Sequence, residues 1–187
     1  MLNYSRIPLH ASCVCARSPR FLRDNECILI TGPSGSGKSV LATAIRGLSP
    51  IPIGAEGLSY IHFKQLADDI VFLCEDGKLR HNPEDLVNPN SPKAVTEGIP
   101  KLLVSLDDPF GASLFDFIIL FHDLKVPFRS FEEFVSFHRT LIKLREIRVL
   151  RLSRAPIDLM VSRVIEEFLR VADFEKRLKA RIGEIQV

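Results

Sequence analysis

The residues of this chain that are best suited to chemistry form one run of eight: Gly32-Pro33-Ser34-Gly35-Ser36-Gly37-Lys38-Ser39. The run fits the pattern G-x-x-x-x-G-K-S. Glycines lack a Cβ atom and tolerate positive φ, so consecutive backbone N–H groups can turn toward one anion. The lysine adds positive charge for the β- and γ-phosphates, and the serine hydroxyl is an oxygen ligand for Mg²⁺. The run therefore predicts a P-loop that binds the phosphates of a purine nucleotide, ATP, together with Mg²⁺.

The segments on either side of this run supply the context that a P-loop requires. Residues 27–31 are mostly apolar and lead straight into a glycine, which predicts a short buried strand. Residues 38–48 place Leu41 and Ile45 at helical spacing, and Gly47 follows as a stop signal. An ordinary glycine-rich turn is the alternative interpretation, and the order of strand, loop and helix disfavours it.

Two adjacent carboxylates, Asp68 and Asp69, interrupt the otherwise apolar segment 65–73. Phosphoryl transfer to a hydroxyl uses a carboxylate near the γ-phosphate to accept the proton, and Mg²⁺ takes further oxygen ligands. The segment is predicted to be a strand, in which neighbouring side chains point to opposite faces. One aspartate would then face the nucleotide, unless the strand ends here and both reach it. Solvated carboxylates at a strand end are the simpler interpretation of these two residues alone.

Three further residues are candidates, one for catalysis and two for contact with a phosphate or a partner. His10 lies in an early strand candidate, where a lone histidine is more often structural than catalytic. Arg151 and Arg154 flank the end of another predicted strand, where a guanidinium could hold a phosphate or a partner's carboxylate. Solvated arginines are the commoner case, so the residues alone favour no role in binding.

The rest of the chain alternates between strand and helix patterns. Residues 114–120 and 147–152 are predicted strands, a capping box at Ser130 begins a helix, and Pro156 begins a long amphipathic helix. The stretch 82–109 is rich in proline and asparagine and divides the chain without marking a second domain. Strands that alternate with helices predict an α/β sheet.

Composition limits the number of domains and the kinds of partner. The chain has 187 residues, of which 46% are hydrophobic and 26% charged, so we expect one globular domain, residues 1–187. A net charge of +2 gives no broad basic surface for nucleic acid or an anionic membrane, and no apolar run is long enough to span a bilayer. The four cysteines form no C-x-x-C pair and are interpreted as reduced thiols. Because no signal-peptide pattern is visible either, we expect a cytoplasmic protein.

Three segments, in this order, resemble the catalytic domain of HPr kinase/phosphorylase in its short bacterial form. They are His10-Ala11-Ser12, the P-loop run and Leu66-Ala67-Asp68-Asp69. Weaker similarities follow in Asp76-Gly77-Lys78-Leu79 and in Arg151-Leu152-Ser153-Arg154. The resemblance covers most of the chain, and it implies a P-loop domain with a mixed sheet like that of phosphoenolpyruvate carboxykinase.

The resemblance also implies an activity and roles for individual residues. The implied activity is ATP-dependent phosphorylation of a serine on the phosphocarrier protein HPr, with a phosphorylase reaction in the reverse direction. Asp68 would be the general base, or the acid in reverse, and His10 beside it would tune its proton affinity. Lys38 and Asp69 complete the candidate catalytic residues.

The chain departs from the pattern of that family at two places. The family usually has an acidic residue directly after the P-loop serine, where this chain has Val40. The family's E-V-R-G signature, whose glutamate contributes to the metal site, should fall within residues 93–99, where only Glu97 could substitute. The candidate metal ligands are therefore Ser39 and Glu97.

Two other functions are compatible with the sequence. The P-loop run is also similar to that of guanylate kinases, so a small-molecule or nucleotide kinase is one alternative, with residues 82–109 as a substrate lid. The change at Val40 and the weak E-V-R-G match favour a second alternative, a nucleotide-binding regulatory module without catalysis. The distinguishing property is phosphoryl transfer, to an HPr-like protein, to a small molecule or to neither.

Assembly is the last expectation. The helix that begins at Pro156 has a broad apolar face, and the resembling family forms oligomers, which together suggest a homo-oligomer, a hexamer if the full family arrangement is kept. An amphipathic helix more often packs on the sheet of its own domain, which is the alternative interpretation of that face.

Overall fold

The computed structural model describes residues 6–18, 25–33, 35–53, 59–68, 70–81, 97–106 and 147–172. Within these residues it has nine strands and two helices, which confirms the expected mixture of α and β structure. The strands are β1 (Arg6–His10), β2 (Ser12–Arg17), β3 (Glu26–Thr31), β4 (Ile51–Ile53), β5 (Ser59–Ala67), β6 (Ile70–Cys74), β7 (Leu79–Arg80), β8 (Glu97–Leu106) and β9 (Arg148–Leu152). The helices are α1 (Lys38–Gly47) and α4 (Ile157–Val171).

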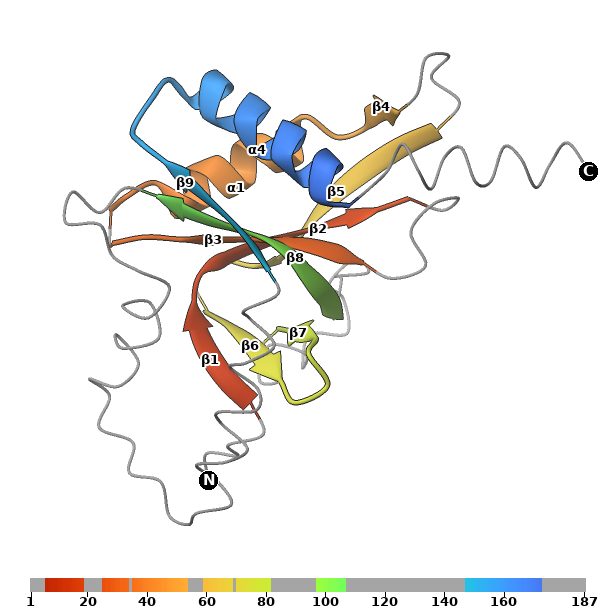
Figure 1. Cartoon of the computed structure of the whole chain (residues 1–187), viewed down its shortest axis with the longest axis vertical. Coiled ribbons are helices and arrows are strands. Elements are labelled where there is room, and N and C mark those ends of the chain that lie inside the picture. Colours follow the sequence, from red (N-terminus) through yellow and green to blue (C-terminus); the bar gives the residue numbers. More distant parts are fainter. Residues whose placement is uncertain are drawn as a thin grey trace, which may run out of the picture.

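All nine strands belong to one mixed sheet. Its order is β1-β6-β7-β8-β3-β2-β5-β4, and β9 pairs with β8 beside this path. The pairs β3–β8 and β8–β9 are parallel, and the other pairs are antiparallel. Figure 1 shows α1 and α4 together on one side of the central strands β2, β3 and β8, and the part of the sheet formed by β1, β6 and β7 on the other side. Because β3, β8 and β9 run in the same direction, their carboxyl ends lie at one edge of the sheet.

Two apolar cores cover the two faces of the central strands. The first core lies under α1 and α4, and the second lies between the central strands and β1, β6 and β7. Along β3, Ile28 and Ile30 belong to the first core, whereas Cys27 and Leu29 belong to the second. Successive side chains of a strand point to opposite faces, so a strand buried on both faces must be apolar throughout. This explains the unbroken apolar pattern that predicted β3.

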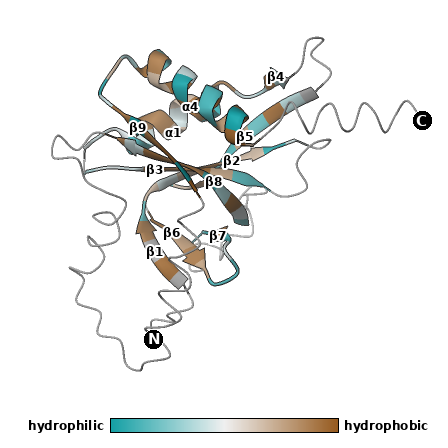
Figure 2. Cartoon of the chain, in the orientation of Figure 1, coloured by the Kyte–Doolittle hydropathy of each residue, from teal (hydrophilic) through white to brown (hydrophobic). Residues whose placement is uncertain are grey.

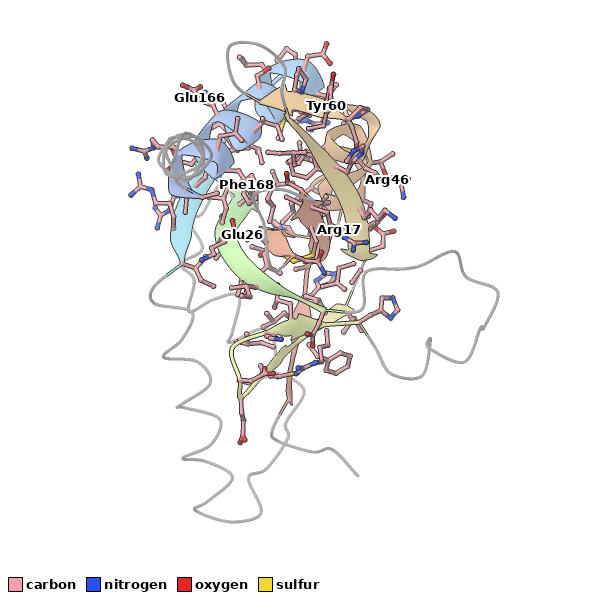
Figure 3. The ribbon with its side chains drawn as sticks, turned by 90° about the vertical axis from the view of Figure 1, so that its right-hand side faces the viewer. Arg17, Glu26, Arg46, Tyr60, Glu166 and Phe168 are labelled. Carbon is pink, nitrogen blue, oxygen red and sulfur yellow. A yellow bond between two sulfur atoms is a disulfide. The ribbon has the colours of Figure 1, made fainter. Side chains whose placement is uncertain are left out.

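The apolar face of α4 is used inside the domain. Phe168 is fully buried, and its ring makes an edge-to-face contact with that of Phe63 on β5, with 5.9 Å between the ring centres. Figure 3 shows Phe168 pointing from α4 toward the sheet, and Figure 2 shows hydrophilic and hydrophobic residues alternating along the helix. Val161 and Val164 are buried on the same face. This face is therefore not a free surface for subunit contacts, and the homo-oligomer stays a prediction without that support.

The cysteines correct one interpretation of the sequence. Antiparallel pairing of β2 with β3 places Cys15 opposite Cys27, and their sulfurs form a disulfide, visible in Figure 3 as a yellow bond. Reduced thiols are therefore the wrong interpretation for this pair, because strand pairing joins residues whose spacing in the sequence carries no signal. Cys13 and Cys74 are free and buried, and burial raises the pKa of the Cys13 thiol. The Cys13 sulfur lies within 4.8 Å of the two disulfide sulfurs.

Two elements differ from the sequence prediction. The predicted single strand over residues 65–73 is divided into β5 and β6, and the chain turns at Asp68. The stretch 82–109, described above as a divider, contains the long strand β8 at its end. The predicted strand 114–120 and the helix from Ser130 lie outside the described residues. No helix in the part of the chain that the structure describes is long and apolar enough to cross a membrane.

Candidate functional site

The glycine-rich loop (residues 32–39) connects β3 to α1 at the edge where the parallel strands end. Gly35 and Gly37 have φ values of 76° and 96°, a region that side chains with a Cβ rarely adopt. Gly32 is required for a different reason: a Cβ atom there would lie 2.7 Å from the Ser36 hydroxyl oxygen and 3.0 Å from the Cβ of Leu106. Ser34 lies outside the described residues. The glycines of the sequence pattern thus correspond to positions that need them.

The first turn of α1 has the properties of an anion site. Gly37 is its N-cap residue, no side chain caps the helix, and its first turn contains no acidic residue. The Ser36 hydroxyl is buried and has no hydrogen-bond partner among the described residues. Because the N–H groups of a helix start are unsatisfied and carry partial positive charge, a phosphate there would supply acceptors for them. A phosphate group therefore fits this loop.

Lys38 lies over the loop that precedes it. Its side-chain amine donates hydrogen bonds to the carbonyl oxygens of Gly32, at 2.9 Å, and Pro33, at 3.0 Å. The residue is buried, with 8% of its surface exposed. A buried ammonium needs acceptors, and here the loop carbonyls supply them. The positive charge is consequently held within the loop. Ser39, the predicted Mg²⁺ ligand, is exposed in the same helical turn.

A cavity of about 440 Å³ adjoins the loop. Its walls include Gly35, Ser36 and Gly37 from the loop, the end of β8 at Leu106, and the start of α4. Arg154, which follows β9, also lines this cavity, so the structure brings one predicted arginine to the loop. Arg151 is exposed on β9 opposite Ser105 and does not line the cavity.

Asp68 and His10 lie at the same edge of the sheet as the glycine-rich loop. In the strand register, Ser12 is opposite Ile30 near the end of β3, and Cys13 is opposite Ala67 at the end of β5. Asp68 follows Ala67 directly, so two strand spacings, roughly 10 Å, separate its position from the start of the loop. The structure thus gathers two predicted catalytic residues at this edge. Their roles stay predictions, and Asp69 lies outside the described residues.

The carboxylate of Asp68 is held by two neighbours that the sequence did not reveal. The buried Ser12 hydroxyl donates to the backbone oxygen of Asp68 and lies 3.3 Å from its Oδ1. The Gln65 amide donates to the same Oδ1 at 3.1 Å, and Gln65 itself accepts a hydrogen bond from Arg46 of α1 at 3.0 Å. Asp68 is exposed but oriented by these contacts. Ser12 was visible only as part of the His10-Ala11-Ser12 motif, and Gln65 carried no signal.

Glu97 does not reach the loop. It begins β8, whereas the loop adjoins the other end of that strand, eight to nine residues and roughly 25–30 Å away. Its carboxylate accepts hydrogen bonds from Lys78 at 2.7 Å and from Arg80 at 2.9 and 3.1 Å. These ion pairs join β8 to the β6–β7 hairpin. The assignment of Glu97 as a metal ligand is therefore corrected, because the residue is distant from Ser39 and is already paired with two cations.

These ion pairs predict a dependence of stability on pH. The hydrogen bond from Lys78, followed by that from Arg80, lowers the pKa of Glu97 below its usual value. The stabilisation is therefore present above the unfolded pKa of about 4.3 and is lost as pH falls through the lower, folded pKa. We expect Glu97→Gln to destabilise the protein by about 0.5–1 kcal/mol at pH 6, because the pair is partly exposed, and by less at pH 3. Urea unfolding of both proteins at the two pH values measures this. An equal difference at both would contradict it.

The end of β8 contains a signal that the sequence interpretation did not use. Leu106 ends the strand beside Gly32, and Asp107 and Asp108 follow it directly in the sequence. An apolar strand that ends in an aspartate beside a P-loop is the pattern of a Mg²⁺-binding carboxylate. Both aspartates lie outside the described residues, so this remains an observation on the sequence.

These features define a mixed α/β domain with a candidate anion site at the carboxyl edge of its parallel strands. No protein-family profile and no curated protein matches the chain. Among solved structures, the fold is similar to that of the HPr(Ser) kinase/phosphatase from Coxiella burnetii, with 17% sequence identity and a TM-score of 0.41 over 96% of each chain. A likeness of this size does not assign an activity to this chain.

Proposed function

We propose that this protein is an ATP-dependent phosphotransferase whose glycine-rich loop acts as a P-loop. The observation that carries the proposal is the loop itself, in which an uncapped helix start, two left-handed glycines and a buried lysine converge beside a cavity. These groups match the phosphates of a nucleotide in charge and in hydrogen-bonding capacity. In this proposal the loop amides and Lys38 bind the β- and γ-phosphates.

Mg²⁺ would be held by the Ser39 hydroxyl together with phosphate oxygens. The fit rests on the exposed position of Ser39 in the first turn of α1, next to the uncapped N–H groups. Bound there, the ion would neutralise phosphate charge. Glu97 is not part of this site.

Asp68 is the proposed general base. Its carboxylate is exposed, so an acceptor can approach it, and Ser12 and Gln65 orient it. It would accept the proton of an acceptor hydroxyl as that oxygen attacks the γ-phosphate. The separation of roughly 10 Å from the loop leaves room for a phosphoryl group and an acceptor between them. His10 would act beside Asp68 as a residue that tunes its proton affinity.

The acceptor proposed is a serine of an HPr-like phosphocarrier protein. This finer statement rests on the ordered resemblance of His10-Ala11-Ser12, the loop and the Asp68 segment. A cytoplasmic location belongs to the same proposal, although the Cys15–Cys27 disulfide removes the support that reduced thiols would have given it. A homo-oligomer, hexameric in the full family arrangement, is likewise part of the proposal.

Transfer of labelled phosphate from Mg-ATP to an HPr-like protein tests this function. We expect Asp68→Asn to lower the transfer rate by about 100-fold or more, because the amide cannot accept the proton, while ATP affinity changes little. Asp76→Asn is the control, since Asp76 is also an exposed carboxylate at a turn but is ion-paired with Arg80 away from the loop. Equal rates for the wild type and Asp68→Asn would remove Asp68 from the mechanism.

The second candidate function is that of a nucleotide-binding regulatory module that does not catalyse phosphoryl transfer. The observation that favours it is the position of Glu97, the metal-site carboxylate that the resemblance implies, which is ion-paired with Lys78 and Arg80 at the end of β8 remote from the loop. Nucleotide affinity that depends on Lys38, together with no transfer to HPr-like proteins, nucleoside monophosphates or sugars, would support the module. Transfer to a small molecule without any HPr-like protein would support a small-molecule kinase instead.

A further inference from the structure

Large apolar side chains are left exposed beside the glycine-rich loop. Val40, in the first turn of α1, is 62% exposed, and Ile157, in the first turn of α4, is 36% exposed. Both line the cavity that adjoins the loop. Exposure of isolated apolar residues is common, but these two lie on different helices and face one cavity.

The residues that line the cavity are of two kinds. Polar groups come from the loop, with its glycine backbone and the buried Ser36 hydroxyl. The large apolar side chains in the lining, here called the apolar wall, include Val40, Leu106, Leu152, Ile157 and Met160. Arg154 is the one charged residue among the described residues that line the cavity. Phosphate alone would use only the loop, whereas the wall suits an uncharged, poorly hydrated group attached to the phosphate.

The wall is fixed by the same elements that position the loop. Leu106 and Leu152 end the parallel strands β8 and β9, opposite each other in register. Met160 belongs to the first core, which holds α4 against α1. In parallel α/β sheets, ligands bind beyond the carboxyl ends of the strands, where helices begin. The volume of about 440 Å³ lies within the range of small-ligand sites, roughly 300–1,000 Å³.

We propose that the apolar wall binds the purine base of the nucleotide, so that the site takes nucleoside triphosphates in preference to inorganic polyphosphate. This inference rests on the proposed binding of phosphates by the loop. The flat faces of a base are apolar, and their contact with Val40 and Ile157 would cover side chains that the fold leaves in water. Val40 thereby gains a role at the position where the resembling family has an acidic residue.

Calorimetric titration with Mg-ATP and with Mg-tripolyphosphate distinguishes the contribution of the apolar wall to binding from that of the loop. We expect the wild type to bind ATP about tenfold more tightly than tripolyphosphate or better, a difference of about 1.4 kcal/mol. In Val40→Ser/Ile157→Ser this preference should fall to about threefold or less, because serine offers little apolar surface. The affinity for tripolyphosphate should not change, which also shows that the loop of the variant remains folded.

The chain offers a matched control. Leu48, at the end of α1, and Leu159, in α4, are 50% and 52% exposed, and neither lines the cavity. Leu48→Ser/Leu159→Ser should therefore keep both affinities of the wild type. If the wild type binds tripolyphosphate as tightly as ATP, the proposed binding of the base by the apolar wall would be overturned, whereas the proposed binding of phosphate by the loop would stand. An equal loss of both ligands in Val40→Ser/Ile157→Ser would also overturn it. Failure of the wild type to bind either ligand would refute the proposed function, and the proposed binding of the base by the apolar wall as well.

Discussion

Lys38→Ala is expected to weaken Mg-ATP binding by roughly 100-fold, about 2.7 kcal/mol, at the upper end of the range for hydrogen bonds to charged groups. The amine belongs to a buried residue and donates hydrogen bonds to the carbonyl oxygens of Gly32 and Pro33 in the candidate anion site. Removal of the amine takes away the only positive side chain in residues 32–39. Isothermal titration calorimetry measures the affinity directly.

One further variant separates the charge of Lys38 from its packing, and another is a control at an exposed lysine. Lys38→Met keeps most of the length of the side chain without the ammonium, so it should bind as weakly as Lys38→Ala if charge is the cause. Lys64→Ala removes an exposed lysine of β5 outside the loop and should leave the affinity unchanged. Circular dichroism must show that all variants are folded. Binding of Mg-ATP by folded Lys38→Ala with the affinity of the wild type would refute the role of the loop.

The region around this lysine was predictable because its signals are local. An apolar run, glycines at fixed spacing and a helical repeat all lie within about twenty consecutive residues, and β3 and α1 have nearly the predicted bounds. The same holds for β9 and for α4, where Pro156 occupies the N-cap position. Each of these elements is recognised from its own residues, without knowledge of its partners.

β8 shows where local signals fail. Its first half contains Gly98 and Pro100, residues that usually weaken a strand, and the preceding stretch is rich in proline and asparagine. In the structure Pro100 lies at an irregularity of the β3–β8 pairing, and Gly98 lies against the Cys15–Cys27 disulfide. The occurrence of both residues in β8 is explained by neighbours that are distant in the sequence. Contacts between residues that are distant in the sequence cannot be recognised from a local sequence pattern.

Glu97 was misplaced for a related reason. A resemblance in the order of motifs says which residue follows which, but not how far along a strand each one lies. The strand register determines the position of a residue along a strand. It places Glu97 beside Lys78 and Arg80 at the end of β8 remote from the loop. By contrast, the structure places Asp68 and His10 at the edge near the loop, because both lie at strand ends adjoining the start of β2, and their catalytic roles stay predictions.

Gly98→Ala is expected to destabilise the protein by about 2–4 kcal/mol, because it overfills a site that cannot relax easily. A Cβ atom at Gly98 would lie 2.2 Å from the Cys27 sulfur and 2.8 Å from the backbone oxygen of Asn25. The sulfur is fixed by its bond to Cys15 within the second core, and the oxygen accepts a hydrogen bond from Ile99 at 2.7 Å. Neither atom is the end of a flexible side chain, so backbone or disulfide must shift.

Gly47→Ala is the matched control for this prediction. Gly47 ends α1, and a Cβ atom there would meet no heavy atom within 4 Å, so alanine should be neutral or stabilise the helix by up to about 1 kcal/mol. Urea unfolding under non-reducing conditions compares the two variants with the wild type. The Cys15→Ala/Cys27→Ala background removes both sulfurs, so Gly98→Ala should cost less there, with a remainder due to the Asn25 oxygen. If Gly98→Ala were as harmless as Gly47→Ala, the close packing of β8 against the disulfide would be refuted.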